Sequence, residues 1–258
     1  MTKKKELQAM KGKLLAIAAV GLMLSACNGN QQADNKGDTS DQPSNAIKIE
    51  EDVYQLKSDD PTGIASIRKS WAKKTLKVDA GDSQVGIAQL AKAFCQEYTR
   101  CETNKALAEY LKDPDSNGES INVEGMSYNI EDLQANGFMC CQMLVETTPN
   151  TQVCYWNRKN GHKLFAAYME HIHENGAFAE HLMVFYDYDP ATGVMTPEPD
   201  LNVRLEKHIK NQDEYSIELP REGKDIVVYA YIVDDEGDSA DDSEWVFVWN
   251  GDTFEWKK

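Results

Sequence analysis

The sequence lacks the short motifs that would assign it a familiar chemistry. It contains no G-x-S-x-G elbow, no P-loop, no G-x-G-x-x-G fingerprint and no C-x-x-C pair. A local signature for a serine hydrolase, a nucleotide-binding enzyme or a thiol redox protein is therefore missing. Positive charge is also scarce, because 27 basic residues face 43 acidic ones, for a formal charge of −16. Such a surface repels nucleic acid, so we expect no nucleic-acid partner, and a cation or a basic partner is the natural complement.

Long apolar runs are scarce too, and the clearest one, residues 14–24, follows a basic start. About 11 residues are too few to span a bilayer core, which needs roughly 20. A basic, then apolar, then small-residue order is typical of a secretory signal peptide. The run ends in Ser25, Ala26 and Cys27. We therefore predict a signal peptide over residues 1–26, although "MKGKLLAIAAVGLMLSAC" from Met10 is already a complete signal.

Leu24-Ser25-Ala26-Cys27 resembles the lipobox of bacterial lipoproteins. The resemblance implies that the Cys27 thiol carries a diacylglyceryl group and that cleavage leaves Cys27 as the first residue. Multiple acyl chains would anchor the protein to a membrane. Asn28 stands where an inner-membrane retention aspartate is found in enteric lipoproteins, so the resemblance favours the outer membrane. The alternative is a generic secretory signal with a chance cysteine at the cleavage point.

The residues after Cys27 divide into a polar stretch and one domain. Residues 27–49 have almost no large apolar side chains before Ile47, and we expect them to form a flexible tether. Residues 50–258 are enough for a single globular domain. Cleavage before Cys27 removes five lysines and one glutamate, which leaves 22 basic and 42 acidic residues and a formal charge of −20.

Five further cysteines allow several disulfide pairings that the sequence does not decide. An odd number requires at least one free or intermolecular thiol. Cys95 and Cys101 could meet only if a helix breaks near residues 99–103, and the adjacent Cys140 and Cys141 would point to opposite faces of a strand. Buried free thiols are the preferred interpretation for the full set, which is Cys95, Cys101, Cys140, Cys141 and Cys154.

Helical periodicity comes first along the domain, and hairpin signals follow. Apolar residues recur at helical spacing from Ile64 to Trp71 and again from Ile87 to Leu111, and residues 113–120 read as a loop. Four Asn-Gly pairs then mark hairpins. Strands are expected over residues 138–146, 151–157, 163–173, 179–189, 225–233, 244–249 and 253–256. The order predicts an α+β fold, with N-terminal helices packed on a curved, mainly antiparallel meander of about seven to nine strands, in one sheet or two layers.

The histidines near Asn175-Gly176 are the most suggestive candidate site. A two-residue turn there would pair positions whose numbers sum to 351, so His171 would face Glu180 and Glu170 would face His181. His171, His173 and Glu180 would share one face as a two-His-one-carboxylate metal set, with His181 on the other face. The preferred alternative is cross-strand His–Glu contacts without a metal, and we expect no cofactor and no catalytic residue.

Two other features have both a structural and a functional interpretation. The acidic residues 234–244 do not satisfy an EF-hand loop, which leaves a loose calcium site or, preferably, a solvated loop. Around Asn250-Gly251 the expected pairs are Trp245 with Trp256 and Phe247 with Phe254. This aromatic ladder forms either core, which we prefer, or an exposed platform for sugars or peptides.

Two function classes follow from these observations. The Asn-Gly hairpins and the closing "VFVWNGDTFEWKK" are similar in style to uncharacterised lipoproteins of Gram-negative gut bacteria, and this resemblance implies no activity. The first hypothesis is a lipid-anchored cell-envelope protein acting as a non-catalytic binding or interaction module for an unidentified protein, peptide or glycan. The alternative is a metal-dependent enzyme or hydrolase that uses the 171–180 hairpin.

Overall fold

The computed structural model describes residues 62–81, 84–144, 149–172, 179–209, 214–233 and 239–257. The chain divides into two units, Met1–Lys57 and Ser58–Lys258, and all described residues belong to the second. The expectations for the signal peptide, Cys27, the tether and His173 lie outside the described residues.

Helices and strands follow one another in an order that confirms a mixed α+β fold. The helical elements are α2 (Ile64–Ser70), η1 (Trp71–Lys73), α3 (Ile87–Glu97), α4 (Glu102–Tyr110), α5 (Pro114–Asn117), η2 (Gln134–Asn136) and α6 (Pro199–Ile209). The strands are β1 (Leu76–Lys77), β2 (Ser120–Val123), β3 (Met126–Leu133), β4 (Phe138–Met143), β5 (Asn150–Asn157), β6 (Lys163–Ile172), β7 (Ala179–Asp189), β8 (Val194–Pro197), β9 (Glu214–Glu218), β10 (Ile226–Val233), β11 (Ser239–Trp249) and β12 (Phe254–Trp256).

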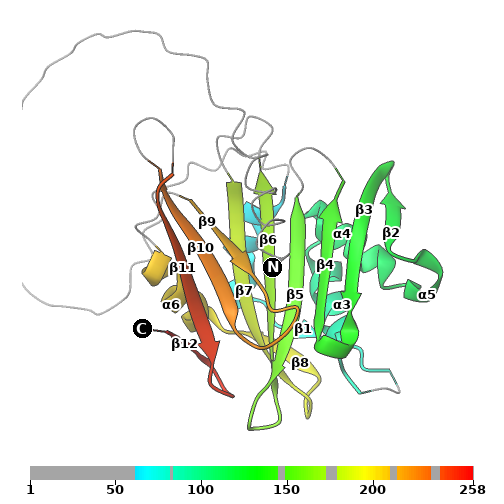
Figure 1. Ribbon diagram of the computed structural model, residues 1–258. Coiled ribbons are helices and arrows are strands. Elements are labelled where there is room, and N and C mark those ends of the chain that lie inside the picture. Colours follow the sequence, from blue (N-terminus) through cyan, green and yellow to red (C-terminus); the bar gives the residue numbers. More distant parts are fainter. Residues whose placement is uncertain are drawn as a thin grey trace, which may run out of the picture. The chain divides into compact units, whose positions relative to one another are not determined.

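The strands form two antiparallel sheets (Figure 1). The larger sheet has the order β1-β8-β7-β6-β5-β4-β3-β2, so β2 to β8 make a meander in which chain neighbours pair. Strand β1 is the exception, because Leu76 pairs with Met195 at the far edge. The smaller sheet has the order β12-β11-β10-β9. The described part of the chain thus holds twelve strands in two sheets, more than the seven to nine expected, since β1, β2, β3, β8 and β9 carry weak sequence signals.

The first helices pack on one face of the larger sheet. Ile64, Ile67 and Trp71 bury one stripe of α2 and η1, and Leu90 and Phe94 do the same for α3. These residues share a core with Tyr186, Val184 and other inward side chains of β3 to β8. The helical periodicity that predicted these elements is therefore the periodicity of one buried face.

The smaller sheet and α6 form a second core with the other face of the larger sheet. Leu201 and Leu205 of α6 and Phe247 and Phe254 of the smaller sheet pack with Phe185 of β7. Because both faces of the central strands are covered, consecutive residues such as Ala166 and Ala167 are fully buried in opposite cores. The alternation of side chains predicted for adjacent cysteines holds, since Cys140 lies in the second core and Cys141 in the first.

The five cysteines of the described domain are all free and buried. The helix break that would let Cys95 and Cys101 meet is present, because α3 ends at Glu97 and α4 begins at Glu102. The two thiols nevertheless stay unbridged. The interpretation as buried thiols is therefore confirmed for this domain.

Two local predictions are wrong, and one helix was not predicted. Residues 113–120 contain the short helix α5 with Pro114 at its start, where a plain loop was expected. Helix α6 was not expected at all.

The terminal hairpin is shifted by two residues, since Phe247 pairs with Trp256 and Trp249 with Phe254. The turn centres on Gly251 and Asp252, because the Asn250 side-chain oxygen accepts the backbone N–H groups of Asp252 (3.1 Å) and Thr253 (3.0 Å).

Candidate functional site

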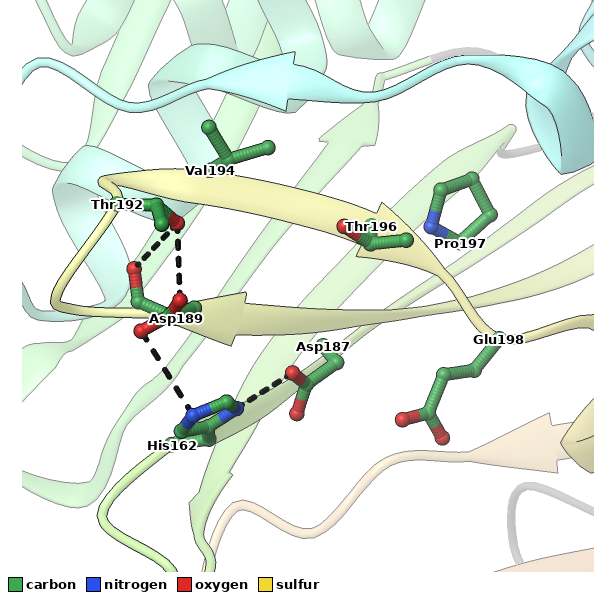
Figure 2. Close-up of a pocket in the computed structure, with 8 residues that line it drawn as sticks. All are labelled: His162, Asp187, Asp189, Thr192, Val194, Thr196, Pro197 and Glu198. Carbon is green, nitrogen blue, oxygen red and sulfur yellow. Dashed lines mark hydrogen bonds and ion pairs between the residues drawn. The ribbon is translucent and has the colours of Figure 1, made fainter.

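A depression among the described residues lies at the end of the larger sheet where β5 connects to β6 (Figure 2). It is open to solvent, with a volume of about 660 Å³. Its lining comes from the residue before β6, the end of β7, the turn that follows it, and β8 with the residue after it. The lining residues are His162, Asp187, Asp189, Thr192, Val194, Thr196, Pro197 and Glu198.

Local turn chemistry presents His162 to this depression. Asn160 lies in the connection between β5 and β6, and its side-chain oxygen accepts the backbone N–H of His162 at 2.9 Å. The Arg158 backbone N–H also donates to the His162 carbonyl oxygen at 2.9 Å, which closes the loop. The Asn160-Gly161 pair, predicted as a hairpin turn, thereby fixes the histidine at the end of the larger sheet where β6 begins.

His162 lies between two aspartates of the neighbouring strand (Figure 2). Its Nδ1 is 2.7 Å from Asp187 Oδ2, and its Nε2 is 3.7 Å from Asp189 Oδ1. The two aspartates are two residues apart on β7, so their side chains project from the same face of the strand. About a third of the His162 side chain is exposed, so the imidazole faces both the acids and the solvent.

Arg158 forms ion pairs with two acids of the depression. Its guanidinium pairs with Asp187 through Nη1 and with Glu198 through Nη1 and Nη2, the latter at 2.8 Å. Its Nε donates to the Asp252 carbonyl oxygen in the β11–β12 turn at 3.0 Å. Only a tenth of the Arg158 side chain is exposed. One cation therefore joins β7, the β8–α6 junction and the smaller sheet.

The electrostatics of the depression favour the ionised form of Asp189. The pKa of Asp189 is lowered, first by the hydrogen bond from the Ala191 backbone N–H and also by the Thr192 hydroxyl and His162. Burial alone would lower the pKa of Arg158, but its bonds to Glu198 and Asp187 outweigh burial and raise it. Three carboxylates against one guanidinium leave an excess of negative charge before His162 is counted.

The Thr192 hydroxyl of the depression is already engaged. Thr192 Oγ1 donates to Asp189 Oδ2 at 3.1 Å, which commits its proton to a carboxylate of the turn. The arrangement therefore offers acceptors and negative charge to a ligand, rather than a nucleophile paired with a base.

A second, smaller cavity of about 70 Å³ brings Cys101 and His171 together near the opposite end of β6. Thr103 and Thr151 lie beside the thiol, with their hydroxyl oxygens 2.7 Å apart. Burial raises the pKa of the Cys101 thiol, although hydrogen bonds from its neighbours partly oppose the shift. A thiol whose pKa is raised is a poor nucleophile, so the cavity does not activate the Cys101 thiol.

The predicted register of the β6–β7 hairpin is confirmed. His171 pairs with Glu180 and Glu170 with His181. Glu180 accepts a hydrogen bond from the Thr62 hydroxyl at 3.0 Å. His181 lies on the other face, as expected, where it contacts Tyr168 and Tyr215.

The described residues include only part of the proposed metal set. His173 lies outside the described residues, so the trio of His171, His173 and Glu180 stays a prediction. Within the described ranges, no three His, Cys, Asp or Glu side chains are arranged to hold a metal ion. Residues 234–238 of the acidic stretch also lie outside the described residues, and residues 239–244 belong to β11.

The aromatic side chains of the terminal hairpin are largely core. Phe247 and Phe254 are buried, while Trp245, Trp249 and Trp256 are half-buried against the same core. His208 of α6 stacks on Trp256 with ring centroids 4.0 Å apart. The helix thus covers part of the ladder, and the preferred interpretation is confirmed despite the shifted register.

Comparisons with known proteins found no match for this chain. No family model, no curated protein and no solved structure matches the chain. In the part of the chain that the structure describes, no helix has the length and apolar character needed to cross a membrane.

Sequence reasoning missed the His162 depression entirely. His162, Asp187, Asp189 and Glu198 come from segments that are separated by up to 36 residues and meet only through strand pairing. The one local signal was "DYD" at 187–189, in which two aspartates at a spacing of two fall on one face of a strand.

Proposed function

We propose that this chain is a lipid-anchored cell-envelope protein, with the outer membrane favoured, whose domain is a non-catalytic binding or interaction module. In this proposal N-terminal helices packed on a curved sheet form the scaffold, and the His162 depression receives a basic group of a protein or peptide partner. Cys27 would carry the lipid, and residues 27–49 would give the domain reach from the membrane.

The observation that carries the binding proposal is the charge balance of the depression. Asp187, Asp189 and Glu198 line it, and the Arg158 guanidinium behind it offsets only part of their charge. A lysine or arginine side chain entering the open depression would meet carboxylates fixed by other hydrogen bonds, so little ordering would be required of them. The acidic composition of the chain adds a long-range attraction for a basic partner.

A charge-matched binding experiment tests this proposal. The full chain with Cys27→Ser, which needs no detergent if the lipid is the anchor, is titrated with a fluorescent hexalysine peptide and with hexaglutamate. Hexalysine should bind, and Asp189→Asn should weaken its binding about threefold to tenfold, since one charge is removed while the turn keeps an acceptor for the Ala191 N–H. Asp115→Asn, at an exposed acid of α5, should leave the affinity unchanged.

Equal weakening by the two asparagine variants would mean that binding follows the general charge of the chain, which contradicts a site at the depression. Equal binding of hexalysine and hexaglutamate would contradict the basic-partner proposal as a whole.

A fractionation experiment tests the anchor. Wild-type chain expressed in a Gram-negative host should require detergent for release from the membrane fraction. Cys27→Ser removes the thiol that the lipid needs and should move the protein to the soluble fraction. Detergent-dependent release of the Cys27→Ser protein would contradict lipidation at Cys27.

A further inference from the structure

Positive charge is concentrated in one segment of this acidic chain. Residues 61–78 contain five basic side chains and no acidic one, although the chain as a whole has a formal charge of −16. Most of this segment forms α2, η1 and β1, and all five basic residues are exposed. We call these five residues the basic edge, and they are Arg68, Lys69, Lys73, Lys74 and Lys77.

The basic edge follows one side of the larger sheet. Near the start of β7, Arg68 donates a guanidinium N–H to the His181 carbonyl oxygen. At the other end of the segment, Lys77 of β1 pairs with Val194 of β8, which in turn pairs with Asp189 at the end of β7. Strand β1 is also the terminal strand of the sheet on this side. The five side chains are therefore spread along a single border of the domain.

Few acids offset the charge of the basic edge. Lys74 pairs with Glu97 of α3, and the other three lysines of the edge form no ion pair with any described residue. Strand β8 contains no acidic residue. On the face of β7 that the helices cover, Glu180 accepts a hydrogen bond from the Thr62 hydroxyl at 3.0 Å. The lysines of the edge are thus available to an external anion.

The opposite side of the same sheet is acidic. Residues 102–132 form α4, α5, β2 and β3, and they contain eight acidic and two basic side chains. Strand β2 is the terminal strand there. Because charges are screened beyond roughly 8 Å at physiological ionic strength, a nearby surface responds to the border that faces it more than to the net charge. An anionic surface would therefore attract the basic edge and repel the acidic side.

We propose that the basic edge binds the anionic phospholipid headgroups of the membrane to which the protein is anchored, so that α2, η1 and β1 face the lipid. This inference rests on the proposed anchor at Cys27. Residues 28–61 join Cys27 to Thr62, the first described residue, just before the basic edge. Each lysine or arginine strengthens binding to an anionic membrane surface about fivefold. A tether also raises the effective concentration to the order of 1 mM, so a few exposed lysines suffice.

Lysine labelling on vesicles tests the proposal. The wild-type, lipidated chain is incorporated into vesicles of phosphatidylcholine alone, or of equal parts of phosphatidylcholine and phosphatidylglycerol, and its acetylation by a water-soluble reagent is followed by mass spectrometry. Protection is the labelling rate in neutral vesicles divided by the rate in anionic ones. Lys69, Lys73 and Lys77 should be protected about threefold or more, and high salt should remove this protection. Lys112, on the acidic side, should show no protection.

Two double variants with the same change in charge distinguish the basic edge from the net charge. Lys69→Gln combined with Lys73→Gln should remove most of the protection of Lys77. Lys105→Gln combined with Lys112→Gln, on the acidic side, should leave the protection of Lys77 unchanged. An equal loss in the two double variants would overturn the proposal, since the attraction would then follow net charge alone.

Three further outcomes bear on the proposal. Equal labelling of the wild-type basic edge in both kinds of vesicle would overturn it and leave the anchor standing. Equal protection by inorganic phosphate added to neutral vesicles would also overturn it, because the edge would then bind free anions. Flotation of the wild-type chain with neutral vesicles reports on the anchor separately. A chain that does not float would contradict the lipid anchor, and this inference with it.

Discussion

The two ends of the β6–β7 hairpin each place a histidine beside carboxylates, with opposite physical results. At one end His162 is about a third exposed and lies between Asp187 and Asp189 in an open depression. At the other end His181 is a tenth exposed and its Nδ1 meets the Tyr168 hydroxyl. The same residue type thus belongs to a solvated ionic cluster in one place and to a buried neutral network in the other.

The buried end shows that burial and nearby charge, more than the distance to an acid, set the protonation state of His181. His181 has a carboxylate oxygen at 3.6 Å, yet its pKa falls to about 4 because burial and Arg68 outweigh that acid. At the His162 end the guanidinium of Arg158 neutralises part of the acidic charge while leaving the depression open.

The largest stability effect is expected from Arg158→Met at the ionic end. The change leaves Asp187 and Glu198 without their shared cation and the Asp252 carbonyl without its donor. We expect a loss of about 3 kcal/mol in the free energy of unfolding, since partly buried charges lose their partner. Urea unfolding followed by tryptophan fluorescence measures it.

Lys105→Met provides the matched control, because Lys105 pairs with Glu124 at an exposed position of α4. Exposed pairs contribute under about 1 kcal/mol, so this variant should be close to wild type. If both variants lose the same free energy, the ionic end is no more than a surface salt bridge and the comparison fails.

A smaller effect is expected from Tyr168→Phe at the buried end. The variant keeps the ring but removes the hydroxyl that lies 2.8 Å from His181 Nδ1. Leaving that buried nitrogen without its partner should lower the free energy of unfolding by about 1–2 kcal/mol at pH 7.5. The deficit should shrink as the pH falls toward 4, because wild type also loses this bond as His181 becomes protonated. A deficit that grows over this range would contradict the neutral network.

The smallest effect is expected from Asp189→Asn, and it should appear only as a pH dependence. The pKa of Asp189 is lowered, so its carboxylate adds stability above about pH 3.8 that is lost as the pH falls further. The melting temperature of the variant should lie slightly below that of wild type at pH 6, and the two should converge near pH 3. A constant difference between them across this range would mean that the Asp189 charge has no part in stability.

How well the sequence predicted each region depended on how local its determinants are. The β6–β7 register was predictable because two long strands flank Asn175-Gly176, and a shift by one residue would move every side chain to the opposite face of the sheet. The terminal hairpin was not, because the Asn250 side chain captures two backbone N–H groups and moves the turn centre to Gly251-Asp252. Asn-Gly pairs alone do not distinguish these two turns.

Helix α6 and the His162 depression escaped prediction for a different reason. Pro199 at the start of α6 and the apolar spacing of Leu201 and Leu205 are helix signals, but they are short and lie between strand-like segments. The two leucines are buried in the second core, and this core forms only after the smaller sheet folds over β5 to β7. The depression likewise requires β8 to lie beside β7, a fact that no local pattern contains.

The pairing of β1 with β8 has a consequence for how the chain folds. Leu76 meets Met195 across about 120 residues, whereas every other pairing in the larger sheet joins neighbours along the chain. Adjacent hairpins have short loops to close and can form early, but the β1 edge must wait until β8 has been made. During synthesis the apolar faces of α2, α3 and α4 therefore emerge long before the strands that cover them, and completion of the first core is a late, long-range event.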